Sequence, residues 1–126
     1  MDYTKIILDQ SKTQEERIQA AFKLENIADE ESITALVKAL DTDPSAIVRH
    51  ECAFSLGETA CFSLAGPPLM KACEKDSNIF VRHEALLALG TLGDLSCVPF
   101  IQKFLQNKDS EIRESAEIAL QRLHKS

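Results

Sequence analysis

The chain has 126 residues, of which 44% are hydrophobic and 27% are charged. This length and balance suit one folded domain with a moderate core, and they argue against a disordered chain. The formal net charge of −6 argues against a general nucleic-acid-binding surface, because such surfaces are basic. No apolar run approaches the roughly 18 residues that a membrane helix needs, and the first residues lack the layout of a secretory signal. We therefore expect a cytoplasmic protein without nucleic-acid or membrane partners.

Helical patterns follow one another along the whole chain. Apolar residues recur at helical spacing, without the alternation that is typical of strands. The expected helices, in chain order, are 3–10, 14–28, 31–40, 44–59, 67–75, 78–92, 97–106 and 110–124. Thr13 followed by Glu16 predicts a capping box at the start of the helix 14–28. Asp43 before a proline predicts an N-cap at the start of the helix 44–59. The Gly-Pro-Pro run at 66–68 is typical of a break between helices.

The sequence repeats itself with a period near 32 residues. Four segments begin with an arginine and have Ala or Cys three residues later, an apolar residue at the fifth place and leucine at the seventh; they start at Arg17, Arg49, Arg82 and Arg113. A period of this length, made of two short amphipathic helices, is typical of an α-solenoid. We therefore expect an all-α fold, with one solenoid domain over residues 1–126 and about four helix-pair repeats, the terminal ones partial.

The repeated arginines have a structural interpretation. Acidic residues lie shortly before three of them, at Asp43, Asp76 and Asp109. Opposite charges at matching positions of neighbouring units predict a ladder of ion pairs that ties adjacent repeats together. We expect Arg49 and Arg82 to belong to this ladder, and we prefer this role to anion binding.

The segment 81–90, Val-Arg-His-Glu-Ala-Leu-Leu-Ala-Leu-Gly, resembles the HEAT-like repeats first noted in bilin lyases. This resemblance covers essentially the whole chain. It implies an α-solenoid built from HEAT-like helix pairs. Because such solenoids are mostly scaffolds, the shape alone implies little about function.

Two central repeats carry a histidine-glutamate pair directly after the arginine. The pairs are His50-Glu51 and His83-Glu84, and the flanking repeats have other residues at the matching places. Equivalent positions of stacked helices lie about 8–10 Å apart and point the same way, so His50 and His83 are expected to reach one metal ion. With Glu84 as a third ligand, two histidines and one carboxylate suit non-haem iron and dioxygen chemistry. The alternative is a pair of metal-free surface histidines.

The residues near the two His-Glu pairs give weaker support for a metal site. Gly57 shares a helix face with His50, and Gly90 shares one with His83, which predicts room for a metal, oxygen or substrate. The same glycines also suit helix ends. Glu51 shares a stripe with Ser55 and Glu58, which predicts a polar, acidic margin beside the site.

Tandem HEAT-like repeats with His-Glu pairs at this spacing resemble the deoxyhypusine hydroxylase family. The segments that carry the resemblance are Arg-His-Glu-Cys-Ala-Phe-Ser-Leu-Gly at 49–57 and Arg-His-Glu-Ala-Leu-Leu-Ala-Leu-Gly at 82–90. That family builds a di-iron site on a solenoid of two similar halves, each with two His-Glu motifs. It hydroxylates the deoxyhypusine side chain of a translation factor with dioxygen. This chain resembles one half.

The resemblance implies roles for four residues. His50, His83 and Glu84 would bind one iron, and Glu51, a further candidate ligand and catalytic residue, would face the amines of the substrate. Since only two motifs are present, the resemblance implies a homodimer with one iron per chain and two per dimer. Dioxygen would be the co-substrate, and the partner would be a protein with a cationic, lysine-derived side chain.

Other functions remain compatible with the same residues. A metal-free HEAT-repeat scaffold explains the fold without the motifs, and a bilin lyase-like or chaperone subunit shares the repeat. A di-iron protein that binds oxygen without turnover would use the same ligands. Zinc or manganese could replace iron, because ligand type alone does not select the metal in cells.

Overall fold

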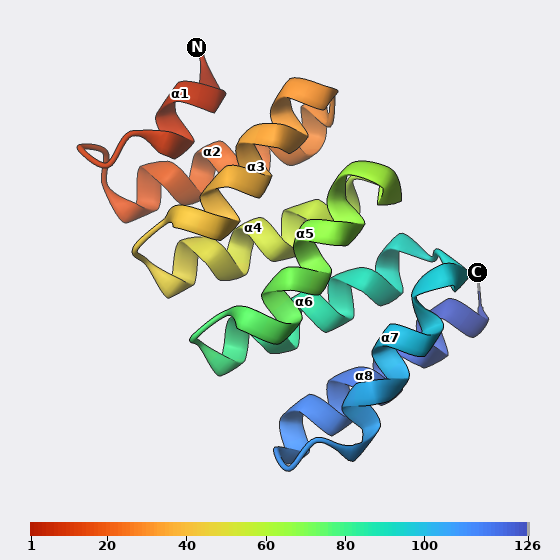
Figure 1. The fold of residues 1–126 in the computed structure, drawn as a ribbon. Helices are drawn as coiled ribbons and strands as arrows, with labels where there is room; N and C mark the ends of the chain where they lie inside the picture. The colour runs from red at the N-terminus through yellow and green to blue at the C-terminus, as the bar shows by residue number, and fades with distance from the viewer. Residues whose placement is uncertain (126) are drawn as a thin grey trace.

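The computed structural model describes residues 1–125, and the only regular elements in this part of the chain are helices. They are α1 (Tyr3–Leu8), α2 (Gln14–Ile27), α3 (Glu30–Thr42), α4 (Ala46–Glu58), α5 (Phe62–Lys75), α6 (Ile79–Leu92), η1 (Leu95–Cys97), α7 (Val98–Gln102), η2 (Lys103–Gln106) and α8 (Ser110–His124). The helix pairs stack side by side in chain order (Figure 1). The predicted all-α solenoid is confirmed.

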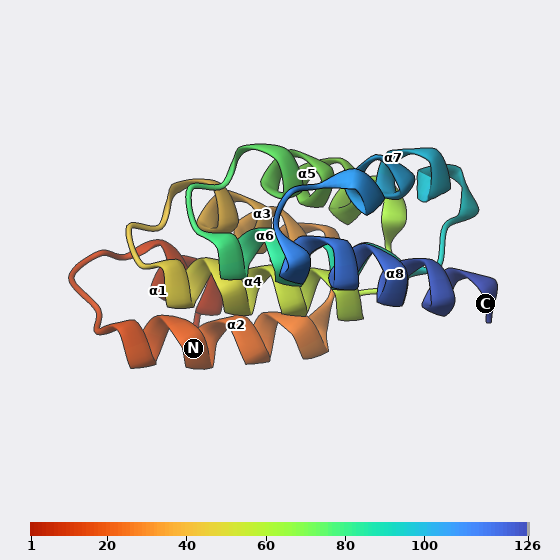
Figure 2. The ribbon, with the colours of Figure 1, turned by 90° about the horizontal axis from the view of Figure 1, so that it is seen from below.

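The helices form two layers (Figure 2). We call α2, α4, α6 and α8 the even layer, and α3, α5 and α7 the odd layer. Within the even layer α4 packs against both α2 and α6, and α6 also packs against α8. Helix α1 packs on α2 and α3 at the N-terminal end. None of the helices in residues 1–125 has both the length and the apolar character that a bilayer crossing requires.

Short polar side chains start the even-layer helices. Each accepts a backbone N–H of the first turn, which satisfies a donor that has no partner within the helix; they are Thr13, Ser45, Asn78 and Asp109. The capping box of Thr13 and Glu16 is confirmed. The predicted cap at Asp43 is wrong by two residues, because Ser45 caps α4 and the Asp43 carboxylate accepts the Ser45 N–H at 2.9 Å.

Helix α5 corrects the predicted break at 66–68. It begins at Phe62 and continues through Pro67 and Pro68. A proline has no N–H for the carbonyl four residues earlier, so the carbonyls of Ser63 and Leu64 lose their helical donors. Both of these residues are exposed, and water can take the place of the missing donors. The two prolines therefore do not end the helix.

The last odd-layer helix is less regular than predicted. The expected helix 97–106 consists of η1, α7 and η2, two of which are short 3-10 turns. Its buried residues, Cys97, Ile101 and Phe104, come one from each piece, and this segment packs mainly on α8. In the terminal repeat the odd layer is therefore made of short helical pieces, whereas α3 and α5 are continuous helices.

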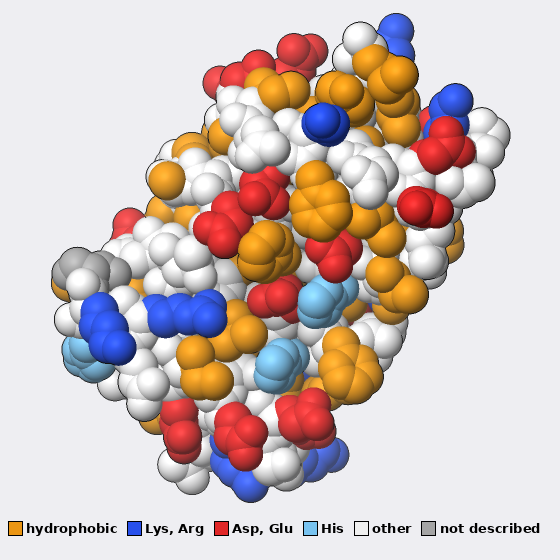
Figure 3. All heavy atoms as spheres, turned by 180° about the vertical axis from the view of Figure 1, so that it is seen from behind, with side chains coloured by type: hydrophobic (Ala, Val, Ile, Leu, Met, Phe, Trp, Pro, Cys, Tyr) orange, Lys and Arg blue, Asp and Glu red, His pale blue; other side chains and the backbone are white. Residues whose placement is uncertain are grey.

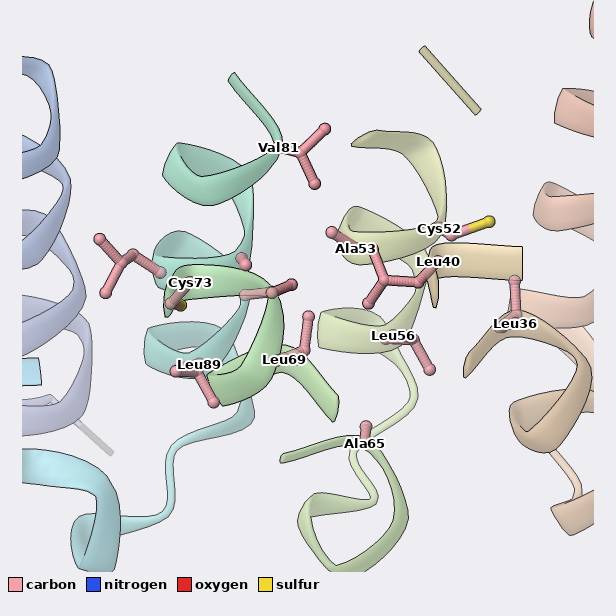
Figure 4. Packing of buried hydrophobic residues seen from close by; sticks show 14 of the residues in the cluster. Leu36, Leu40, Cys52, Ala53, Leu56, Ala65, Leu69, Cys73, Val81 and Leu89 are labelled. Carbon is pink, nitrogen blue, oxygen red and sulfur yellow. The ribbon is translucent and has the colours of Figure 1, made fainter. Parts of the chain in front are cut away.

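The core lies between the two layers. Leucines from α3, α4, α5 and α6 point into it, together with smaller side chains such as Ala53, Cys73 and Val81 (Figure 4). Cys52 and Cys73 are buried without disulfide partners, and this burial raises the pKa of both thiols. These cysteines act as small apolar residues of the core.

Glycines set the spacing of the even layer. A Cβ atom on Gly57 would lie 2.8 Å from the Cβ of Ala88, and one on Gly90 would lie 2.7 Å from the Cα of Ala119. No side chain fits at either place, so glycine allows α4 to approach α6 and α6 to approach α8. The prediction that these glycines leave room for a metal or substrate is therefore wrong, since a neighbouring helix fills the space.

Two ion pairs of the expected ladder are present. Arg17 Nε lies 2.8 Å from Asp43 Oδ2, and Arg49 Nε lies 3.0 Å from Asp76 Oδ2. In each pair a second guanidinium nitrogen donates to the other carboxylate oxygen, at 3.2 Å. Each pair links an even-layer helix to the end of the odd-layer helix of the next repeat. The predicted role of Arg49 is confirmed.

The third step of the ladder is missing. Asn107 lies at the position that corresponds to Asp43 and Asp76, and its side chain accepts the Asp109 N–H at 2.9 Å. Asp109 itself caps α8. Arg82 Nε instead donates to the Cys73 carbonyl at 2.9 Å, within its own repeat. The prediction that Arg82 and Asp109 belong to the ladder is therefore wrong, because the acid is replaced by an amide.

Candidate metal centre

Helices α4 and α6 place the two His-Glu pairs at matching positions. His50 is the fifth residue of α4 and His83 is the fifth residue of α6. Because the two helices start in register and pack against each other, the pairs come from neighbouring turns of the even layer. The predicted register of the motifs is confirmed.

His50 lies between two carboxylates. Its Nε2 atom is 3.5 Å from Glu84 Oε1 on α6, and its Nδ1 atom is 3.8 Å from Glu51 Oε1 on its own helix. The His50 side chain is 36% exposed, whereas that of Glu84 is 15% exposed. The contact between α4 and α6 therefore brings together two of the predicted ligands, one imidazole and one carboxylate, at a partly covered site.

The surroundings of Glu84 are electrostatically mixed. Burial raises the pKa of its carboxyl above the usual range, because the charged form loses water. Positive charge on His50, His83 and Arg122 would lower the pKa of Glu84, and the negative charge of the Glu51 carboxylate raises it further. His83 and Glu51 are thus close enough to Glu84 to influence its charge, although His50 makes the direct contact.

Arg122 of α8 is a neighbour of the site that the sequence analysis missed. Its guanidinium donates to the Leu87 carbonyl at 3.2 Å and to Thr91 Oγ1 at 3.0 Å, both on α6. The other repeats have no basic residue at the corresponding position. The repeat pattern therefore gave no signal for it.

The four predicted residues do not form a completed metal site. Among residues 1–125, no group of three or more His, Cys, Asp or Glu side chains is arranged to hold a metal ion. The donors nevertheless fit iron in kind, since His50, His83, Glu84 and Glu51 supply imidazole nitrogens and carboxylate oxygens. What the structure brings together is the His50–Glu84 pair, with His83 and Glu51 beside it.

Apolar side chains flank both histidines. Ile47 and Phe54 lie three residues before and four after His50, so all three share a face of α4, and Phe80 and Leu87 have the same relation to His83. Ile47 is 55% exposed and Phe80 is 59% exposed. Figure 3 shows histidines beside acidic and apolar side chains near the middle of one face of the molecule. Exposed apolar groups around a polar centre are typical of a binding surface.

The acidic margin differs from the prediction. Ser55 is buried, and its hydroxyl donates to Glu25 Oε1 of α2 at 2.9 Å. It therefore does not lie beside Glu51 at the surface, whereas Glu58 is exposed as expected. The acidic groups of the margin come from α4 and also from α2.

Known repeat families match most of the chain. The model for HEAT repeats matches residues 66–126, and the model for the PBS lyase HEAT-like repeat matches residues 16–42. The expected resemblance to HEAT-like repeats is confirmed.

Curated relatives at 36–40% identity are deoxyhypusine hydroxylases. The enzyme of Candida albicans is 38% identical over 118 residues, which cover 91% of this chain and 36% of that protein. The enzyme of Dictyostelium discoideum is 40% identical over 104 residues, which cover 82% of this chain and 33% of that protein. The chain thus spans about a third of the length of the curated relatives it matches.

Solved structures support the same relation. Human deoxyhypusine hydroxylase, in complex with glycerol, superposes with a TM-score of 0.90 and 33% identity, over 98% of this chain and 43% of that one. The complex of CpcE and CpcF of phycocyanin lyase from Nostoc gives a TM-score of 0.73 at 24% identity, which shows a shared fold. The predicted resemblance to the deoxyhypusine hydroxylase family is confirmed over one part of those longer proteins.

Proposed function

We propose that this chain, which is similar in sequence to about a third of the length of curated deoxyhypusine hydroxylases and similar in fold to part of the human enzyme, is an iron-dependent hydroxylase that uses dioxygen. The observation that carries the proposal is the approach of His50 Nε2 to Glu84 Oε1, at 3.5 Å, across the contact between α4 and α6. An imidazole and a mostly buried carboxylate meet there, and a second His-Glu pair supplies His83 and Glu51 beside them.

His50, His83 and Glu84 would hold one iron per chain. Bound iron would supply the activation of dioxygen that an amino acid side chain cannot provide. The raised pKa of Glu84 indicates that a nearby cation would be favourable, because a positive charge stabilises the buried carboxylate. Loading would require rotation of side chains, so that the third donor joins the His50–Glu84 pair.

The remaining groups would bind and orient the substrate. The Glu51 carboxylate, 27% exposed, would accept hydrogen bonds from a cationic, lysine-derived side chain. The exposed apolar groups of Ile47 and Phe80 would cover the aliphatic part of that side chain and exclude water. Deoxyhypusine, which gives the relatives their name, is a substrate of this chemical kind.

A homodimer would complete a di-iron site. The family has four His-Glu motifs and this chain has two, so a second copy would supply the missing pair through a two-fold axis. Ile47, Phe54 and Phe80 are exposed around the motifs, and a second copy would remove them from water. Removal of such groups from water favours association.

Metal analysis of sized protein tests the proposal. Protein expressed with ample iron should contain about one iron per chain in particles of twice the chain mass. His50→Ala and His83→Ala should each remove the iron without loss of helicity. His124→Ala changes a histidine of α8 outside the motifs and is the matched control. Trace iron in the parent protein, or unchanged iron in both motif variants, would contradict the ligand assignment.

A second measurement separates turnover from oxygen binding. The iron-loaded protein is incubated with dioxygen and a deoxyhypusine-containing peptide, while oxygen consumption and peptide mass are followed. Hydroxylation should add one oxygen atom to the peptide. Glu51→Gln should reduce the rate of hydroxylation more than Glu58→Gln does. Oxygen uptake without a change in the peptide would instead indicate an oxygen-binding protein without turnover.

A metal-free scaffold is the second candidate. It is favoured by the exposed apolar side chains of Ile47 and Phe80 around the motifs. In that case a partner protein would bind the same face without iron. Phe80→Glu would then abolish partner binding, whereas His50→Ala would leave it intact.

A further inference from the structure

A groove lies in the odd layer between α3 and α5. Its volume is about 790 Å³, and none of the four His-Glu residues lines it. The floor is apolar and comes from Val37 and Leu40 on α3 and from Pro67, Pro68 and Ala72 on α5. Together these five side chains form an apolar trough between the two helices.

The acidic groups of this groove are already neutralised by the chain itself. Every aspartate that lines it forms an ion pair with a cation of the same molecule: Asp41 with Lys71, Asp43 with Arg17 and Asp76 with Arg49. Their negative charges are therefore compensated and do not repel an acidic ligand strongly.

Two basic groups of the groove remain available. Lys38 on α3 and Lys75 at the end of α5 are exposed, and no ion pair within residues 1–125 involves either of them. The chain as a whole has a net charge of −6, so two uncompensated lysines beside an apolar trough form a local exception. Such a combination complements a ligand that carries both carboxylates and apolar side chains.

We infer that this groove binds an extended acidic peptide segment of a partner protein. A helix of 13 residues such as α3 is roughly 20 Å long, which accommodates about six residues of an extended chain. Alternate apolar side chains of the segment would pack on Val37, Pro67 and Pro68, and its carboxylates would pair with Lys38 and Lys75. This inference is independent of iron and of the hydroxylase proposal.

Fluorescence anisotropy with a defined probe tests the inference. The probe is a labelled eight-residue peptide in which leucine alternates with glutamate, and its control replaces each glutamate by lysine. The acidic peptide should bind the parent protein and the lysine peptide should not. The double variant Lys38→Glu/Lys75→Glu should weaken binding by roughly tenfold or more. The matched control, Lys23→Glu/Lys108→Glu, reverses two exposed lysines outside the groove and should bind normally.

A further variant separates groove binding from general charge attraction. Val37→Ser removes apolar contact from the floor without changing charge, and it should also weaken the acidic peptide. Binding that is insensitive to Val37→Ser, or equal for both peptides, would overturn the inference. It would also be overturned if the peptide bound only the monomer, since a second copy of the chain would then be the occupant. His50→Ala should leave peptide binding unchanged, so failure here and failure of the iron proposal remain distinguishable.

Discussion

The α4–α6 contact and the α6–α8 contact are built alike but present different chemistry. Gly57 meets Ala88 in the first, and Gly90 meets Ala119 in the second, so the backbones approach in the same way. Only the first contact brings a histidine to a glutamate of the neighbouring helix. In α8 the matching positions are Glu114 and Ser115. The residues that pack the helices together and the residues that form the site therefore occupy separate positions of the repeat.

The polar ties between repeats differ as well. The Arg17–Asp43 and Arg49–Asp76 pairs connect the first three helix pairs, but Asn107 leaves Arg82 without the corresponding acid. The repeats that carry the His-Glu motifs are therefore joined by a partly buried ion pair, whereas the polar contacts of the terminal repeat are hydrogen bonds from Arg122 of α8 to Leu87 and Thr91 of α6.

Breaking the ladder should have the largest effect on stability. Asp43→Ala leaves the buried Arg17 guanidinium uncompensated and removes the acceptor of the Ser45 N–H. We expect a loss of about 3–5 kcal/mol in the free energy of unfolding, measured by urea denaturation. Asn107→Ala, at the corresponding position of the last repeat, leaves no charge unpaired and should cost less than about 1 kcal/mol. Equal losses would show that the two junctions do not differ in this way.

Filling the glycine contacts should separate packing from chemistry. Gly57→Ala and Gly90→Ala each place a Cβ atom against the neighbouring backbone, and each should destabilise the fold by about 1–3 kcal/mol. Only Gly57→Ala moves α4 away from α6, so only this variant should also reduce iron content. A similar loss of iron in Gly90→Ala would indicate that the metal responds to overall stability and not to the His50–Glu84 distance.

The protonation of Glu84 should have a smaller effect. A raised pKa means that folding favours the protonated form, and this stability is lost as the pH rises through the raised pKa. Glu84→Gln imitates the protonated form, so the metal-free variant should exceed the parent protein in stability by about 1 kcal/mol or less at neutral pH. The difference should vanish below about pH 4. A difference that instead grows toward acidic pH in urea titrations would reverse the sign assigned to Glu84.

Restoring the missing acid should have the smallest effect. Asn107→Asp places a carboxylate where the other junctions pair with arginine, and Arg82 is the available partner. Because the new pair would be partly exposed, a gain of about 0.5 kcal/mol is expected. A thermal melt compared with that of the parent protein measures it, and no gain would mean that the Cys73 carbonyl holds Arg82 in place.

The features that depend on the period of the sequence repeat could be predicted. The arginine spacing located the even-layer helices, the solenoid and the matching register of His50 and His83. Features that depend on a single exchange were missed, such as the amide at Asn107 that removes the third ion pair. The continuation of α5 through Pro67 was also missed, because solvation of freed carbonyls depends on exposure. Arg122 has no counterpart in the repeats, so only the packing of α8 on α6 reveals it.

The iron proposal requires that imidazoles of neighbouring repeats bind one iron together with a carboxylate. X-ray absorption at the iron edge of the metal-loaded protein tests it most directly. We expect scattering from two imidazoles per iron in the parent protein and from one in any iron retained by His50→Ala, with the signal of His124→Ala unchanged. Iron surrounded by oxygen ligands alone, with the same spectrum in His50→Ala, would show that the imidazoles do not bind it.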